Sequence, residues 1–203
     1  MRQLTVNWPG KTVSRAEGGY KYQSARFKIV DLPGTYSLLS TSTDEEIARD
    51  FILFGQPDVT VVVVDATRLE RNLNLVLQVL EITDRVVVCL NLMDEARRRG
   101  LQVDDRRLAR DLGIPVVPTA ARYDDGLTEL IRTVQQVASG ELVSRPHRTQ
   151  SKSPELTGAI AQLAAQIESE FPGLPNVRWV AMRLLDGDTS IATALSQGEL
   201  GRL

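Results

Sequence analysis

Two short polar signatures each follow an apolar stretch of the chain, at a point where a strand is expected to end. Asp31-x-x-Gly34 follows an alternating stretch, and Asn91-x-x-Asp94 follows a run of apolar residues. A carboxylate at Asp31 can bind a magnesium-bound water, and the backbone N–H of Gly34 can approach a phosphate oxygen because no Cβ blocks it. The first signature is therefore typical of a segment that senses a γ-phosphate and its magnesium ion.

The second signature is typical of a segment that binds guanine. Asp94 can accept hydrogen bonds from N1–H and N2–H₂ of guanine, a pair of donors that adenine does not offer. Asn91 would tie neighbouring loops together, and Thr119-Ala120 would offer a backbone N–H to guanine O6. Because the carboxyl ends of parallel strands meet at one edge of a sheet, these segments predict one nucleotide site.

Both signatures also have simpler interpretations. Asp31-x-x-Gly34 is compatible with an ordinary turn after a strand, and Asp94 is compatible with a helix cap for residues 95–99. The phosphate-binding loop Gly-x4-Gly-Lys-Ser/Thr is absent from the sequence: Gly10-Lys11-Thr12 matches its end, but Thr5 stands where the first glycine is required. We therefore expect very weak GTP binding, because the N–H groups of that loop supply much of the affinity for phosphate.

Strands and helices are predicted to alternate from Ile29 to Ala138, which is the pattern of a doubly wound α/β domain. The β-branched run at 58–65 does not alternate with polar residues, so we expect a strand covered on both faces. Gly18-Gly19 predicts a turn, and 23–25 predicts a hairpin bend. The predicted strands are 21–30, 58–65, 85–90 and 114–117, and the predicted helices are 43–54, 69–82, 104–112 and 126–138.

The composition changes after Gly140. Residues 144–154 are polar and contain two prolines, which indicates a linker. Apolar residues at three- and four-residue steps then predict helices at 154–171 and 176–185. Two such helices need a partner surface, so a small helical subdomain is expected.

The net charge, the numbers of cysteines and histidines, and the length of the apolar runs exclude several classes of protein. A net charge of -2 over 203 residues gives no reason to expect nucleic acid as a partner. The single cysteine, Cys89, lies in an apolar run and is expected to be buried, and with His147 as the only histidine a metal centre of these ligands is not expected. No run is long enough to cross a bilayer and no signal peptide is recognisable, so we expect a soluble, cytoplasmic chain.

Several segments together resemble the cytosolic GTPase domain of the ferrous iron transport protein B family. They are 6–13 (VNWPGKTV), 31–38 (DLPGTYSL), 91–96 (NLMDEA) with Arg99-Gly100, and in the helical part Arg178-Trp179 and 184–188 (LLDGD). The resemblance implies a P-loop GTPase-like, Ras-like, mainly parallel sheet. It divides the chain into a GTPase-like domain at 1–142, a linker at 143–154 and a partial helical subdomain, similar to a nucleotide-dissociation inhibitor, at 155–203.

The resemblance also implies roles for individual residues. Magnesium, bound together with GTP or GDP, would be held by Thr12 and Asp31. Leu92 stands where other GTPases often have lysine, and Thr35 stands where many carry a water-positioning glutamine, so no catalytic residue is assigned. Potassium activation belongs to the intact family domain. The implied nucleotide-binding residues are Gly34, Asn91, Asp94, Thr119 and Ala120.

The resemblance implies partners and a location as well. The family domain lies on the cytoplasmic face of the bacterial inner membrane, joined to a membrane-spanning iron channel, and the resemblance is compatible with a homo-oligomer. The family pattern places a strand, the phosphate loop and a helix before the position of Met1, and that strand lies inside the sheet. We therefore expect unpaired ladder groups on its two neighbours, 27–31 and 58–65.

Three functions are compatible with these observations. The first is the GTP-binding and GTP-hydrolysing domain of a transporter of this family. The second is a degenerate GTPase-like regulatory module that does not hydrolyse GTP. The third, another small GTPase such as a ribosome-assembly factor, is disfavoured by the near-neutral charge and by the Asn-Trp-Pro-Gly segment at 7–10.

Overall fold

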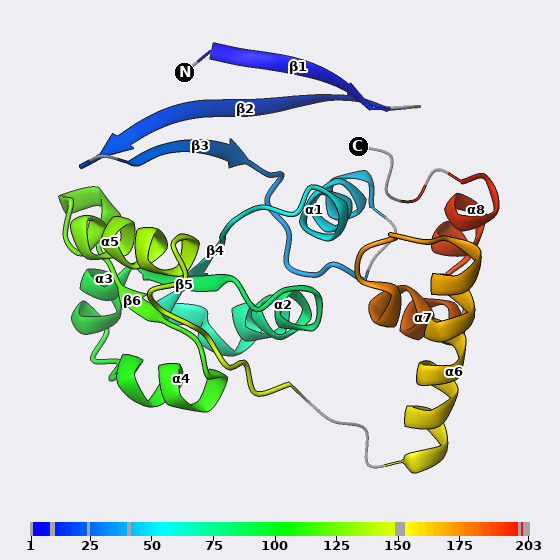
Figure 1. Ribbon diagram of the computed structural model, residues 1–203. Coiled ribbons are helices and arrows are strands. Elements are labelled where there is room, and N and C mark those ends of the chain that lie inside the picture. The colour runs from blue at the N-terminus through cyan, green and yellow to red at the C-terminus, as the bar shows by residue number, and fades with distance from the viewer. Residues whose placement is uncertain are drawn as a thin grey trace.

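The computed structural model describes residues 2–8, 11–23, 25–39, 42–148, 153–198 and 200, with side chains from residue 17 onward. Its strands form two separate three-stranded sheets, one antiparallel and one parallel (Figure 1). Helices alternate with the strands of the parallel sheet and pack against it, which confirms the α/β class. A further group of helices lies to one side of it.

The first sheet is an antiparallel meander at the N-terminal end of the chain. Its strands are β1 (Arg2–Trp8), β2 (Lys11–Tyr22) and β3 (Ala25–Asp31). The hairpin bend at 23–25 is confirmed, and Gln23 there has a φ of 51°. The turn predicted at Gly18-Gly19 is wrong: both glycines lie within β2, opposite Ile29 and Lys28. Cross-strand pairing on β3 holds them extended, although glycine alone favours a turn.

The second sheet is parallel and follows the predicted alternation. Its strands β4, β5 and β6 are joined by connections that contain helices, as parallel pairing requires. The predicted helices are all present, with ends that differ by at most a few residues. The elements of this part are α1 (Thr43–Phe54), β4 (Thr60–Asp65), η1 (Ala66–Arg68), α2 (Leu69–Ile82), β5 (Val86–Asn91), α3 (Met93–Arg98), α4 (Asp105–Leu112), β6 (Val116–Pro118), η2 (Ala121–Tyr123) and α5 (Leu127–Ala138).

The burial of the parallel strands differs from the prediction at one strand. All of β5 except its last residue is buried, as its apolar sequence indicates. In β4, Val62 and Val64 are buried, but Val61 and Val63 are 39% and 61% exposed. The expectation that this strand is covered on both faces is therefore wrong. Its sequence is uniformly apolar, but within the described residues it is an edge strand with one face open.

In the part of the chain that the structure describes, the two sheets are not hydrogen-bonded to each other. Among the described residues, β3 pairs only with β2 and β4 pairs only with β5. This agrees with the expectation that the strands at 27–31 and 58–65 each have an unpaired edge. Ile29 on β3 is also 51% exposed. Both strands thus combine exposed apolar side chains with an edge that no described strand pairs with, an arrangement that soluble sheets usually avoid.

The C-terminal part is helical and packs on the rest through a common core. Its helices are α6 (Pro154–Glu170), α7 (Val177–Leu185) and α8 (Thr189–Ser196), of which α8 was not predicted. Ile160, Trp179 and Ile191 belong to the same buried cluster as residues of α1, α2, β4 and β5. A hydrogen bond from Asn176 Nδ2 to the carbonyl of Leu53, 2.9 Å long, links this part to the end of α1.

Candidate functional site

The carboxyl ends of the parallel strands lie at one edge of the second sheet. The register places Asp65 of β4 beside Asn91 of β5, and Leu90 beside Pro118 of β6. The residues that follow these strands therefore start from neighbouring positions. This is the arrangement in which open α/β sheets bind ligands.

Asn91 joins two of the segments that follow these strands. Its side-chain oxygen Oδ1 accepts a hydrogen bond from the N–H of Ala121 (3.1 Å) and one from the hydroxyl of Thr119 (3.3 Å). Asn91 thus makes the kind of loop-to-loop contact that its place in the signature predicts.

Thr119 and Ala120 are both buried, with 1% and 3% of their surface exposed. The N–H of Thr119 donates to the carbonyl of Leu90 (2.8 Å), and the N–H of Ala120 donates to the carbonyl of Asp125 (3.0 Å). Both amides therefore already have an acceptor within the chain. A guanine O6 would have to share the Ala120 amide with Asp125 or replace it.

Asp94 lies in the first turn of α3, directly after the edge of the sheet. Its carboxylate contacts Arg98 Nη2 at 3.4 Å, and 24% of the side chain remains exposed. The cap position of α3 belongs to Leu92, which has left-handed backbone angles (φ 63°, ψ 31°) and makes no side-chain cap bond. The alternative in which Asp94 caps this helix is therefore wrong, and its carboxylate is accessible to a ligand.

The residues of the first signature lie at the end of the antiparallel sheet. Asp31 is the last residue of β3, opposite Ala16, and is exposed. Gly34 is also exposed, and a Cβ added to it would have no atom within 4 Å. Thr12 lies in β2 opposite Asn7, and its side chain is outside the described part of the structure.

A polar pocket of about 240 Å³ lies at the carboxyl edge of the parallel sheet, and Asp31, Gly34, Asn91 and Asp94 are not among the described residues that line it. Tyr36, two residues after Gly34, lies on its wall together with Leu92 from the second signature and Asp65 from the end of β4. Segments that are far apart in the sequence therefore meet at this edge. The wall also contains Arg71, whose guanidinium lies 3.9 Å from the centroid of the Tyr36 ring. Sequence reasoning missed Arg71, because no motif marks it.

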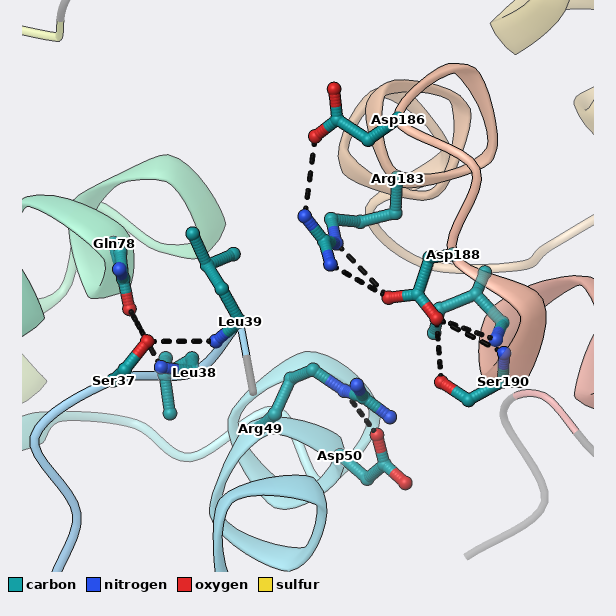
Figure 2. Close-up of polar contacts among 11 residues, drawn as sticks. Ser37, Leu38, Leu39, Arg49, Asp50, Gln78, Arg183, Asp186, Asp188 and Ser190 are labelled. Carbon is teal, nitrogen blue, oxygen red and sulfur yellow. Dashed lines mark hydrogen bonds and ion pairs between the residues drawn. The ribbon is translucent and has the colours of Figure 1, made fainter. Parts of the chain in front are cut away.

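The segment after Gly34 is held by side chains that the sequence did not indicate. Figure 2 shows Gln78 of α2 pointing at Ser37 and Leu38, and Arg49 of α1 paired with Asp50. The same view shows Arg183, Asp186, Asp188 and Ser190 at the junction of α7 and α8.

The side chains that could act as metal ligands were compared with what magnesium binding requires. Among the described residues, no cluster of three or more His, Cys, Asp or Glu side chains is suited to hold a metal ion. Magnesium bound with a nucleotide needs no such cluster, since it is usually held by one or two carboxylates, water and the phosphates. The exposed carboxylate of Asp31 fits that mode.

Cys89 is buried in β5, as predicted, and lies next to the site. Burial raises the pKa of its thiol, while a contact with the hydroxyl of Thr119, 3.3 Å away, lowers it by less. The cysteine therefore behaves as an unreactive apolar residue.

Comparison with known proteins places this chain in a family. A family model described as ferrous iron transport protein B matches residues 1–134. The chain belongs to the ferrous iron transport protein B family. The Fe(2+) transporter FeoB of Escherichia coli K12 is 37% identical over 191 residues, which cover 92% of this chain and 24% of that protein.

Solved structures of this family have the same fold. The cytosolic domain of the T. maritima FeoB iron transporter in GDP form II aligns with a TM-score of 0.81 at 33% identity, covering 96% of this chain and 76% of that one. The same domain in its GMPPNP form gives a TM-score of 0.80 at 32% identity over the same shares. The FeoB G-domain from Methanococcus jannaschii gives 0.59 at 44% identity, covering 61% and 79% of the two chains.

The FeoB relatives are longer than this chain, which spans about a quarter of the curated E. coli protein. Within the described residues of this chain, no helix is long and apolar enough to cross a membrane.

Proposed function

We propose that this chain is the guanine-nucleotide-binding, GTP-hydrolysing regulatory domain of a FeoB-type ferrous iron transporter. The observation that carries the proposal is the contact of Asn91 with Thr119 and Ala121 at the end of β5, next to the accessible carboxylate of Asp94. This contact brings the loops after β5 and β6 together beside an acceptor that suits N1–H and N2–H₂ of guanine.

In this proposal each signature has its own task. Asp94 selects guanine, Asn91 holds the loops, and Thr119-Ala120 lies beside O6. Asp31 and Thr12 hold magnesium, and the N–H of Gly34 meets the γ-phosphate. The T. maritima domains named for their GDP and GMPPNP forms support guanine nucleotides as the ligand class. Magnesium, when bound, would neutralise phosphate charge.

The proposal includes the arrangement of the whole protein. Residues 1–142 form the GTPase-like domain, 143–154 a linker and 155–203 a helical subdomain of the nucleotide-dissociation-inhibitor type. The domain works on the cytoplasmic face of the membrane, joined to the iron channel of the same protein. Potassium activation and self-association are further properties that the family relationship suggests.

Replacing Asp94 by asparagine tests the assignment of the base site. Asp94→Asn should weaken GDP binding and strengthen binding of xanthosine diphosphate relative to GDP by about a hundredfold, because an acceptor for N2–H₂ is lost. NMR titration at millimolar nucleotide is suitable for weak binding. Asp105→Asn, in the first turn of α4, is the matched control and should leave the ratio unchanged. Unchanged guanine preference in Asp94→Asn would contradict the proposal.

A degenerate regulatory module is the second candidate function. It is favoured by the internal acceptors of the Thr119 and Ala120 amides, which leave no donor ready for O6 among these two. Measuring phosphate release at saturating GTP separates the candidates, because a degenerate module would bind the nucleotide without releasing phosphate.

A further inference from the structure

The segment that follows Gly34 is fixed on one side by α1. The hydroxyl of Thr35 lies 3.2 Å from Glu45 Oε1 in the first turn of α1 and also contacts the carbonyl of Ser37, so its one proton is shared between these two acceptors. The N–H of Ser37 donates back to Thr35 Oγ1 at 3.1 Å. The residue next to Gly34 is thus part of a small local network that ends on a helix.

On its other side the same segment is bound by Gln78 of α2. Its Oε1 accepts a hydrogen bond from the N–H of Leu38 (2.6 Å) and one from the hydroxyl of Ser37 (3.2 Å). Ser37 Oγ in turn accepts from the N–H of Leu39 at 3.1 Å, as Figure 2 shows. One carboxamide oxygen therefore fixes two successive residues, only a few positions after the phosphate-sensing glycine.

Arg71, about two turns before Gln78 on α2, contacts the same segment. Residues seven apart lie on the same face of a helix, about two turns from each other, so Arg71 and Gln78 face the same segment. Arg71 covers the ring of Tyr36, while the side chain of Leu38 is 1% exposed and belongs to the core cluster that includes Trp179 and Ile191. The segment is held between the edge of the sheet and the helical part.

We propose that Gln78 is a positioning residue: it holds the segment after Gly34 so that Gly34 can contact the γ-phosphate. This role rests on the proposed guanine-nucleotide function. Gln78 keeps residues 35–38 docked on α2, so that the N–H of Gly34 is presented from a fixed loop. Because docking orders the loop before the nucleotide binds, the entropy cost of ordering it does not reduce the affinity for the nucleotide. GDP has no γ-phosphate, so binding of GDP does not depend on this anchor.

Two substitutions of Gln78 separate positioning from simple packing. Gln78→Leu removes the acceptor at similar volume, and Gln78→Glu keeps an oxygen that accepts both bonds. Asn74→Leu changes an exposed amide on the same helix and is the matched control. Hydrogen exchange at the Leu38 amide should rise about tenfold in Gln78→Leu and stay at the parent rate in Gln78→Glu and Asn74→Leu. Unchanged exchange in Gln78→Leu would overturn the anchor.

Nucleotide binding supplies the second readout. In Gln78→Leu, affinity for GMPPNP should fall about tenfold relative to GDP, and Gln78→Glu should restore the parent ratio. Equal loss for both nucleotides would mean a purely structural role and would overturn the proposal. If the parent chain bound neither nucleotide, the proposed function itself would fail and the γ-phosphate role with it. Exchange at Leu38 would then still show whether Gln78 holds the segment.

Discussion

The side-chain oxygen of Asn91 lies 3.1 Å from the backbone nitrogen of Ala121, so the last residue of β5 holds the loop that follows β6. This contact involves residues that are distant in sequence, and it lies beside the acidic residue proposed to bind guanine. The segments proposed to bind guanine are therefore held together by hydrogen bonds within the chain.

Replacing Asn91 by alanine should lower the free energy of unfolding by about 1 kcal/mol, because the hydrogen bonds from Ala121 and Thr119 are lost. The cost stays modest because the Ala121 amide is exposed and can bind water instead. Urea unfolding followed by circular dichroism measures the change. Asn74→Ala on the exposed face of α2 should cost less than half as much, and an equal cost in both variants would contradict the role of Asn91.

Gly126 should not tolerate a side chain. It has a φ of +79°, and a Cβ added there would lie 2.2 Å from the carbonyl oxygen of Pro118 at the end of β6. Gly126→Ala is expected to reduce the free energy of unfolding by about 2 kcal/mol or more. Gly158→Ala, in the interior of α6 with no atom within 4 Å, should instead raise it by about 0.5–1 kcal/mol. The opposite signs can be measured in one urea series.

Asp188 should make the stability of the helical part depend on acid pH. Burial raises the pKa of its carboxyl, but hydrogen bonds from Ser190, Arg183 and the Ile191 amide, with the charge of Arg183, outweigh this and lower it below the usual value. The stabilisation is therefore complete above the usual carboxyl pKa of about 3.9 and is lost as the pH falls through the lowered one.

Thermal unfolding between neutral pH and pH 2.5 checks this sign. Asp188→Asn should reduce the melting temperature at neutral pH and flatten its fall in acid. Asp186→Asn is the control, since the Asp186 carboxylate is 68% exposed and lies 3.2 Å from Arg183 Nη1. A fall in acid that remains as steep in Asp188→Asn as in the parent would show that other carboxylates dominate.

The sequence predicted the parts of this fold that repeat a local rule. The helix at 69–82 was predicted to the residue, because its leucines recur at helical spacing. At the start of α1, Ser42 rather than the neighbouring Thr43 caps the helix, and its side chain accepts from the N–H of Glu45. Neighbouring Ser and Thr residues offer equivalent caps, so only the backbone geometry decides between them.

The sequence predicted less where long-range pairing decides the structure. Gly18 and Gly19 are extended because β3 pairs with them, and Val63 is exposed because, within the described residues, one face of its strand is not covered. At the site, Asn91 and Asp94 were predicted from their spacing. Gln78 was not, since a glutamine on a helix carries no motif and acquires its role only when residues 37–38 dock on it.

The left-handed backbone of Leu92 fixes the turn before Asp94 without any ligand. A leucine in that conformation costs of order 1 kcal/mol, and the surrounding structure bears this cost before any ligand is present. The turn that precedes Asp94 is thus set in advance, and the residues after Gly34 are also held before a ligand binds, by the hydrogen bonds of Ser37 and Leu38 to Gln78. A nucleotide would therefore find both segments already ordered, one by a strained turn and the other by side-chain hydrogen bonds.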